Sequence, residues 1–260
     1  MPTPRGSATH WGEHSPGRRL PAAETRERLL SAAVRMLRAT GLTVSLEHLS
    51  MEELIREADV PRSSVFRIWG SKANFFSDLL LELIRPESAF SSGYDLEADA
   101  QIMALVQRHQ HLLATPEGRR AVLEEVVRVG IELYSDRVFG SQTFRFHAAL
   151  GAALPTIPEP QRSRVEAALA DAESTYVAHL AGLYEAIMPA VHLRPKEGLT
   201  TTDVAAAGSA LVQGLAERRR MLPELAGHTL MRPGIGGEPV AWTLGAIAFL
   251  AIVDGMAETT

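Results

Sequence analysis

A cluster of helix start and stop signals in the N-terminal third most constrains what this chain can fold into. Ser50 followed by Glu53 is a capping box, which predicts a short helix over residues 51–58. Pro61 has its backbone preset for a first helical turn, and it predicts a second short helix that runs to Trp69. Because so few residues separate the two helices, they must cross at a steep angle.

Two further helices flank this pair. Thr25 is expected to cap a helix over residues 26–39, whose apolar residues recur every three or four positions. Ser71 is expected to cap a fourth helix over residues 72–84, which ends before Pro86. Such an arrangement of four helices needs no strand.

The second short helix has two chemically different faces. Helical spacing predicts that one face anchors the helix, through Val65, Ile68 and Trp69. The other face is expected to project Arg62, Ser63, Phe66 and Arg67. A steeply crossed pair whose second helix carries outward Arg, Ser and an aromatic ring is typical of a helix-turn-helix that enters the major groove of DNA.

The segment over residues 25–83, with the run VPRSSVFRIWGSK, resembles the DNA-binding domain of the TetR family of transcriptional regulators. The resemblance implies a repressor that binds an inverted repeat in double-stranded DNA as a homodimer. It implies phosphate contacts by Ser50, Ser64, Phe66 and Lys72, and base contacts by Arg62, Ser63 and Arg67. The sequence departs from the family at Asp59, where glycine is common, and at Pro61, which replaces a capping Ser or Thr.

The remaining chain shows no period-2 alternation, so the sequence predicts an all-α protein: a three-helix helix-turn-helix domain and a larger helical domain. Helices are expected over residues 96–114, 116–134, 141–154, 159–188, 202–221 and 238–256. The predicted parts are a mobile N-terminal arm (1–24), a helix-turn-helix DNA-binding domain (25–85) and a regulatory and dimerisation domain (86–260). The loop over residues 222–237, rich in Gly and Pro, is expected to be partly disordered or to form a lid.

The last two predicted helices, 202–221 and 238–256, are candidates for the homodimer interface. Both are rich in small apolar residues, and the second is apolar around its whole circumference. A helix without a polar face must be buried, either in its own core or against a partner chain. The apolar run 240–257 is expected to be such a packing helix, not a membrane span.

Composition argues against several classes of protein. The chain of 260 residues has no cysteine, which excludes disulfides and Cys-ligated metals and is compatible with a reducing cytoplasm, where we expect the protein. It has no P-loop, no His-Glu-x-x-His and no Glu-x-x-His motif, so no enzyme activity, metal or cofactor is expected. The net charge is −5, yet the first 85 residues hold 12 Lys and Arg against 10 Asp and Glu. A polyanion partner would therefore bind the N-terminal part of the chain.

Aromatic residues of the middle helices are candidates for a small-molecule effector pocket. They are Phe144, Phe146, His147, Tyr176 and Tyr184. Two hypotheses stay open: a repressor released from DNA by a small apolar effector, or a DNA-binding regulator without one, controlled by a protein partner or constitutive. An apolar cavity of about a few hundred Å³ would favour the first, and a fully packed core the second.

Overall fold

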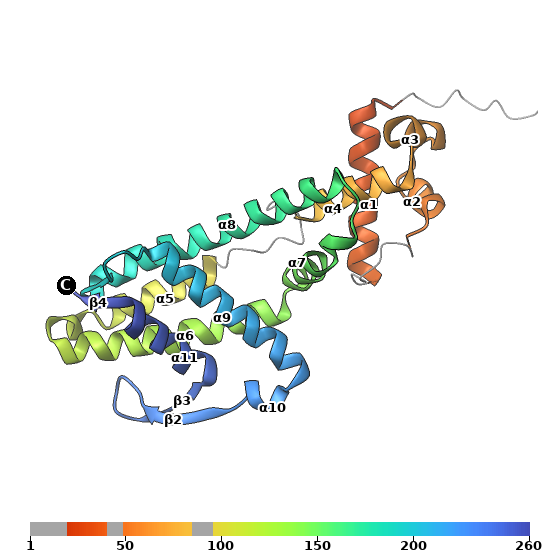
Figure 1. Ribbon diagram of the computed structural model, residues 1–260. Helices are drawn as coiled ribbons and strands as arrows, with labels where there is room; N and C mark the ends of the chain where they lie inside the picture. Colours follow the sequence, from red (N-terminus) through yellow and green to blue (C-terminus); the bar gives the residue numbers. More distant parts are fainter. Residues whose placement is uncertain (1–19, 41–48, 85–95) are drawn as a thin grey trace, which may run out of the picture. The chain divides into compact units, whose positions relative to one another are not determined.

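The computed structural model describes residues 20–40, 49–84 and 96–260; most of the expected arm and the predicted boundary near residue 86 lie outside them. The described residues up to Asp78 form one compact unit, and those from Leu79 onward form another. Figure 1 shows helices in both units and two small antiparallel sheets in the second. The predicted all-α class is confirmed, with the two sheets as an addition.

The first unit holds α1 (Ala22–Thr40), α2 (Met51–Glu57), α3 (Arg62–Trp69) and the start of α4 (Lys72–Ile84). The observed bounds of α2, α3 and α4 agree with the prediction to within one residue. Its core consists of apolar side chains that are almost fully buried, among them Leu29, Leu37, Leu54, Val65 and Phe75. The predicted helix-turn-helix is thus present as two short helices packed against a longer one.

Thr25 does not cap α1, which corrects the prediction. The helix begins before it, at Ala22, and Thr25 is fully buried inside the helix. The hydroxyl of Thr25 donates to the carbonyl oxygen of Pro21 at 3.1 Å, one helical turn back. Bonding to the i−4 carbonyl is the alternative use of a threonine hydroxyl in a helix, and spacing alone does not separate it from capping.

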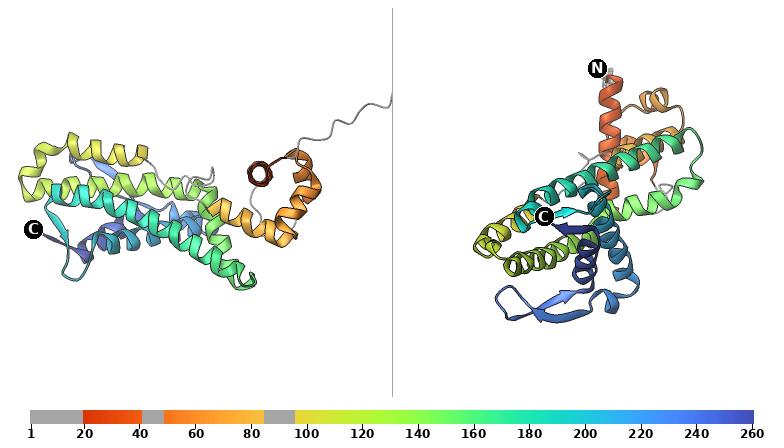
Figure 2. Two further views of the ribbon diagram at one scale, coloured as in Figure 1. Left: turned by 90° about the horizontal axis from the view of Figure 1, so that it is seen from above. Right: turned by 60° about the vertical axis from the view of Figure 1, so that its left-hand side comes forward.

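The second unit is a helical bundle around α6 (Pro116–Gly140), which packs against α5 (Leu96–Arg108), α9 (Thr201–Met221) and α11 (Leu244–Met256). The long helix α8 (Gln161–Ile187) packs against α9, and both views in Figure 2 show the two side by side. The bundle also includes the shorter α7 (Gln142–Ala153), α10 (Pro223–Ala226) and the 3₁₀ turns η2 (Gln110–Ala114), η3 (Leu154–Thr156) and η4 (Met188–Val191). The expected helix 96–114 is therefore divided between α5 and η2.

Two strand pairs correct the prediction that the chain has no strands. β1 (Leu193–Pro195) pairs with β4 (Ala257–Thr259), and β2 (Thr229–Pro233) pairs with β3 (Pro239–Thr243). The expected helix 238–256 starts only at α11, because Thr243 ends β3 and caps the helix with its hydroxyl, which accepts from the backbone N–H of Ala246 at 3.2 Å. The expected loop 222–237 contains α10 and β2. A short apolar run fits a strand as well as a helix, which explains the error.

α11 buries one side in the bundle through Gly245, Ala246, Phe249, Leu250 and Val253. Its other side stays partly open, with Ala251 and Gly255 exposed. In the described part of the chain, no helix combines the length and the apolar character that crossing a membrane requires. Because one side of α11 is buried in the bundle, residues 244–256 form a packing helix, as predicted.

Candidate functional site

The turn between α2 and α3 has the backbone geometry that a tight helix-turn-helix needs. Ser50 caps α2, since its hydroxyl accepts from the backbone N–H of Glu53 at 3.4 Å. Asp59 adopts the left-handed conformation, with φ of 49°, where the resemblance led us to expect glycine. Pro61 is the N-cap of α3 and provides no side-chain cap. Gly70, with φ of 70°, ends α3.

The side chains of α3 divide between a buried and an exposed side of the helix, as predicted. Val65 and Trp69 are buried and Ile68 is half-buried, whereas Arg62, Ser63 and Arg67 are exposed. Phe66 is 49% exposed, a large value for an aromatic side chain. Four side chains of one short helix therefore form an open surface, which we call the α3 face: Arg62, Ser63, Phe66 and Arg67.

Ser64 is placed differently from the other serine of α3. It is only 7% exposed and lies on the buried side of the helix, next to Val65. Its hydroxyl is therefore not part of the α3 face, although the resemblance had implied a phosphate contact. Ser63, the preceding residue, is exposed, because adjacent residues of a helix point to different sides.

Trp69 joins α3 to the rest of the first unit through several contacts. Its indole Nε1 donates to Oδ2 of Asp78 on α4 at 2.7 Å, and its ring meets Phe75 edge-on with centroids 5.2 Å apart. Its backbone carbonyl accepts from the amide of Asn74 at 2.7 Å. Arg26 on α1 donates to the same oxygen of Asp78. Bonds from three helices thus fix the orientation of the α3 face.

The cations around the α3 face are exposed to solvent. Arg62 lies 3.2 Å from the Glu52 carboxylate and 5.5 Å over the ring of Phe66. The ammonium of Lys72, in the first turn of α4, lies 5.0 Å over the ring of Phe76. Arg67 makes no ion pair with any described residue. Ion pairs this exposed are worth about 0–1 kcal/mol, so a polyanion can replace them at little cost.

The second unit contains an apolar cavity of about 70 Å³, called here the core cavity. Of the predicted pocket residues, only Tyr184 lines it; Phe144, Phe146, His147 and Tyr176 do not. Most of its wall comes from residues that sequence analysis did not single out, chiefly Ile102, Val127, Ile131, Tyr134, Leu183, Val204 and Phe249. Aliphatic side chains at helical spacing carry no signal that separates a cavity wall from a filled core.

The other predicted aromatics occupy packing positions. Phe146 is buried on α7, and Phe144 lies with its ring 5.9 Å from the guanidinium of Arg220. Burial lowers the pKa of His147. Tyr176 packs beside the small cluster of Leu180, Ala181 and Ala205.

A polar group borders the core cavity at Tyr134. The Tyr134 hydroxyl donates to Asp99 on α5, and His179 Nε2 on α8 lies 2.8 Å from the other oxygen of that carboxylate. Burial raises the pKa of Tyr176 to about 12, and it also raises the pKa values of Tyr134 and Tyr184. Because the three polar residues come from α5, α6 and α8, their pairing has no signature in the sequence.

Comparison with known proteins gives structural neighbours only. The sequence matches no protein-family model and no curated protein. A putative TetR-family transcriptional regulator from Mesorhizobium loti is 11% identical with a TM-score of 0.48, over 92% of this chain and 100% of that one. The reduced form of E. coli NemR is 18% identical with a TM-score of 0.44, over 91% and 100%. TetR-family regulators are thus among the structural neighbours.

A further neighbour has a described role. NalD of Pseudomonas aeruginosa, the secondary repressor of the MexAB-OprM multidrug efflux pump, is 18% identical with a TM-score of 0.36, over 91% of this chain and 98% of that one. All these identities lie below 20% and all these TM-scores below 0.5. Function has therefore to be inferred from the residues of this chain.

Proposed function

We propose that the chain is a sequence-specific DNA-binding transcriptional regulator that acts as a repressor. The observation that carries the proposal is the α3 face, in which two arginines, a serine and a half-exposed phenylalanine project from a short helix locked by Trp69. A helix with this chemistry fits the major groove of B-form DNA. A solvated surface helix would not need so large an exposed aromatic side chain.

The residues around α3 divide into two roles. Arg62 and Arg67 can each donate two hydrogen bonds to guanine O6 and N7, and Ser63 can accept or donate at a base edge. Lys72 holds the DNA backbone from the first turn of α4, and Ser50 contacts it from the start of α2. Phe66, without a hydroxyl, supplies apolar contact. Ser64 is buried and has no part in the proposed contacts.

The proposed regulator is a homodimer through α9 and α11. Small residues on the open sides of both helices, Ala206 and Ala210 on α9 and Ala248 and Ala251 on α11, permit close approach of a second copy. Large exposed apolar side chains lie at the end of α9 and in the segment after it, at Met221, Leu222, Leu230 and Met231. A two-fold dimer would cover this surface and place two α3 faces on an inverted repeat.

Small-molecule control belongs to the proposal because the core of the second unit is not fully packed. The core cavity is apolar and carries Tyr134 and Tyr184 as polar groups, which suits a small apolar effector. Its volume of about 70 Å³ is well below the few hundred Å³ expected for such a pocket. A DNA-binding regulator without an effector is therefore the second candidate, and the small volume favours it.

Selection from a random duplex library tests DNA binding directly. We expect enrichment of an inverted repeat, and an affinity for it that falls steeply as salt is added, because several phosphates are neutralised. Equal affinity for the selected and a scrambled duplex would refute the proposal. Release of the selected duplex in a gel shift against a panel of metabolites then decides between the two modes of control.

A further inference from the structure

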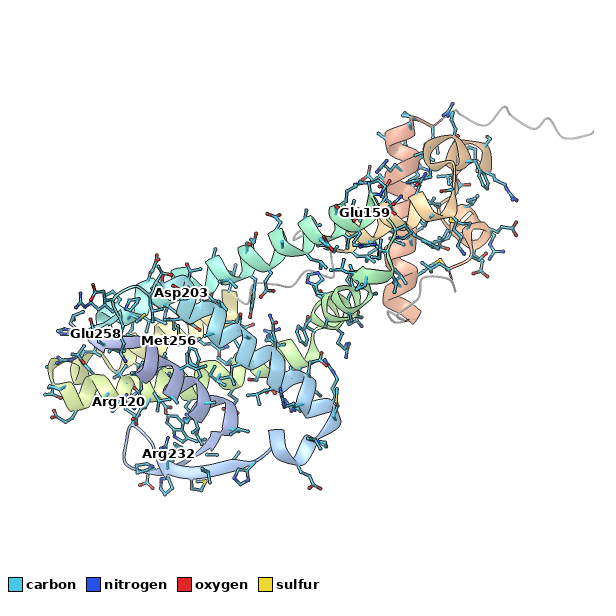
Figure 3. The ribbon with its side chains drawn as sticks, viewed as in Figure 1. Arg120, Glu159, Asp203, Arg232, Met256 and Glu258 are labelled. Atoms are coloured by element: carbon cyan, nitrogen blue, oxygen red, sulfur yellow. The ribbon has the colours of Figure 1, made fainter. Side chains whose placement is uncertain are left out.

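The core cavity has a neighbour with which it shares a wall. A second recess of about 190 Å³, called here the outer recess, lies where the start of α6 meets β1, β4 and the end of α11. Figure 3 shows Arg120 and Glu258 at this end of the unit. Both cavities are lined by Leu123, Val191, Leu193 and Val253. These four side chains come from four different elements and belong to the wall that the two cavities share.

The two cavities differ in chemistry. The core cavity is lined by hydrocarbon side chains and two tyrosines, whereas the outer recess has Arg119, Arg120, Asp254 and Glu258 in its wall. Each is smaller than the roughly 300 Å³ at which ordinary ligand pockets begin. A ligand that enters both needs an apolar part for the first and a polar part for the second.

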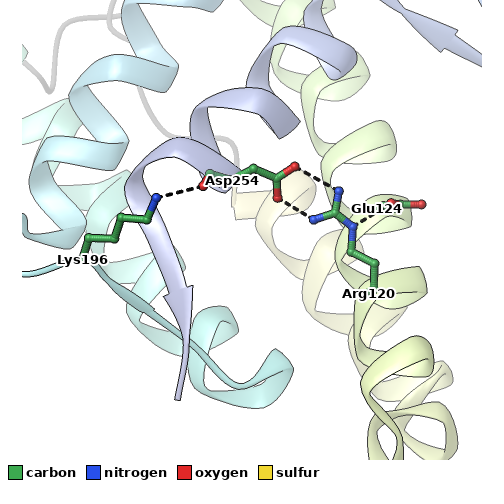
Figure 4. Close-up of polar contacts among 4 residues, drawn as sticks. All are labelled: Arg120, Glu124, Lys196 and Asp254. Carbon is green, nitrogen blue, oxygen red and sulfur yellow. Dashed lines mark hydrogen bonds and ion pairs between the residues drawn. The ribbon is translucent and has the colours of Figure 1, made fainter.

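Most charges of the outer recess are already paired. Figure 4 shows Arg120 donating to both carboxylate oxygens of Asp254, one of them at 3.0 Å, and to Glu124 at 2.7 Å. Lys196 donates to the backbone carbonyl of Asp254 at 3.2 Å. Glu258 lies 2.8 Å from Arg194 on the paired strand. The three carboxylates and Arg120 and Arg194 therefore each have a partner of opposite charge already.

Of the two arginines in the wall of the outer recess, Arg119 is the one without a carboxylate partner among the described residues. It is half-buried in the wall of the outer recess, and its guanidinium donates to the backbone carbonyl of Leu113 at 3.1 Å. No carboxylate of the described residues forms an ion pair with it. A half-buried guanidinium with donors to spare and no counter-ion favours an anion with two oxygens.

We infer that the core cavity and the outer recess together bind an amphipathic carboxylate, with its carboxylate on Arg119 and its aliphatic chain in the core cavity. The chain passes the shared wall when Leu193, on the three-residue strand β1, turns aside. An apolar cavity of such small volume fits an unbranched chain better than a ring system. The inference deepens the effector part of the proposed function and rests on it.

A matched set of amphiphiles tests the inference on the full-length protein without DNA. Decanoate, decanamide and decylamine share one chain and differ in the charge of the head group, and butyrate keeps the carboxylate but lacks the chain. Calorimetric titration below the micelle concentration should give decanoate about tenfold or greater preference over the amide and the amine, and no measurable binding of butyrate. Equal binding of decanoate and decanamide, or no binding of decanoate, would overturn the inference.

Two variants locate the head group. Arg119→Met keeps the aliphatic stem and removes the charge, so decanoate should bind no better than decanamide. Arg108→Met removes an exposed arginine outside both cavities and should leave the preference unchanged. An unaltered preference in Arg119→Met would refute the assignment. Titration of duplex DNA without ligand is a separate measurement. Decanoate binding without DNA binding keeps the assignment of the ligand site but removes its role as an effector site, together with the proposed function. DNA binding without decanoate binding removes only the inference.

Discussion

The indole Nε1 of Trp69 donates to Oδ2 of Asp78 at 2.7 Å, and this bond joins the exposed helix α3 to α4. Trp69 is 5% exposed, so the bond is largely shielded from water. Arg26 brings α1 to the same carboxylate. The residues of the α3 face owe their orientation to a side chain on the opposite face of their own helix.

Trp69→Phe removes this bond while keeping an aromatic ring. We expect the first unit to lose about 1–3 kcal/mol of unfolding free energy, because a buried carboxylate loses a donor. Trp69→Phe should change the sequence preference of DNA binding less than it changes the free energy of unfolding. The control is Trp242→Phe, since the buried Nε1 of Trp242 has no hydrogen-bond partner among the described residues. If both variants lose the same stability in urea unfolding, the hydrogen bond of Trp69 contributes nothing specific.

Arg67 and Lys72 should separate base reading from backbone binding. Arg67→Ala is expected to cost about 1–3 kcal/mol at the selected duplex and little at random DNA, relaxing preference at one position per half-site. Lys72→Ala should weaken binding to both duplexes and lower the salt slope by about one per half-site. Titrations of matched and scrambled duplexes check this. The opposite pattern would mean that α3 is oriented differently in the groove.

Glu52 opposes DNA binding in our proposal, because it pairs with Arg62 at 3.2 Å and carries the charge of a phosphate. Glu52→Gln should raise DNA affinity, by up to about fivefold at low salt, as expected for releasing an exposed ion pair. Glu57→Gln is the matched control, since Glu57 pairs with Arg35 on α1. An equal gain in both variants would show an effect of net charge rather than release of Arg62.

The homodimer can be tested at one small residue. Ala248→Glu places a charge on the half-buried side of α11 and should yield monomers in sedimentation, because burying an unpaired carboxylate at an interface is costly. Ala104→Glu, at an exposed alanine of α5, should not change the mass. A dimer that survives Ala248→Glu would exclude α11 from the interface.

Buried tyrosines couple stability to high pH. Burial raises the pKa of Tyr176 to about 12, above the 10.0 of a free tyrosine. The stability that the neutral phenol provides is fully present below about pH 10 and is lost as the pH rises through about 12, because only the unfolded chain ionises readily in that range. Urea unfolding should show this loss, and Tyr176→Phe should reduce it. Ionisation of Tyr176 near pH 10 in an absorbance titration would contradict the expectation.

The sequence by itself determined the helix-turn-helix. Its signals are local: the Ser50 cap, the proline before α3, the glycine after it and the Ser71 cap each act within one helical turn. Local hydrogen bonds and backbone preferences depend on neighbours in the chain, so the bounds of α2, α3 and α4 and the two faces of α3 could be predicted. The error at Thr25 arose because its hydroxyl can either accept from a backbone N–H as a cap or donate to the carbonyl one turn back.

Only the tertiary structure decided the second unit. Residues 239–243 form a strand because they pair with β2, and the periodicity of a sequence does not reveal such a partner. The core cavity, the contacts of Asp99 with Tyr134 and His179, and the outer recess with Arg119 all arise where separate elements meet. Such contacts depend on how helices pack over long sequence separations, and a single sequence carries no pattern for them.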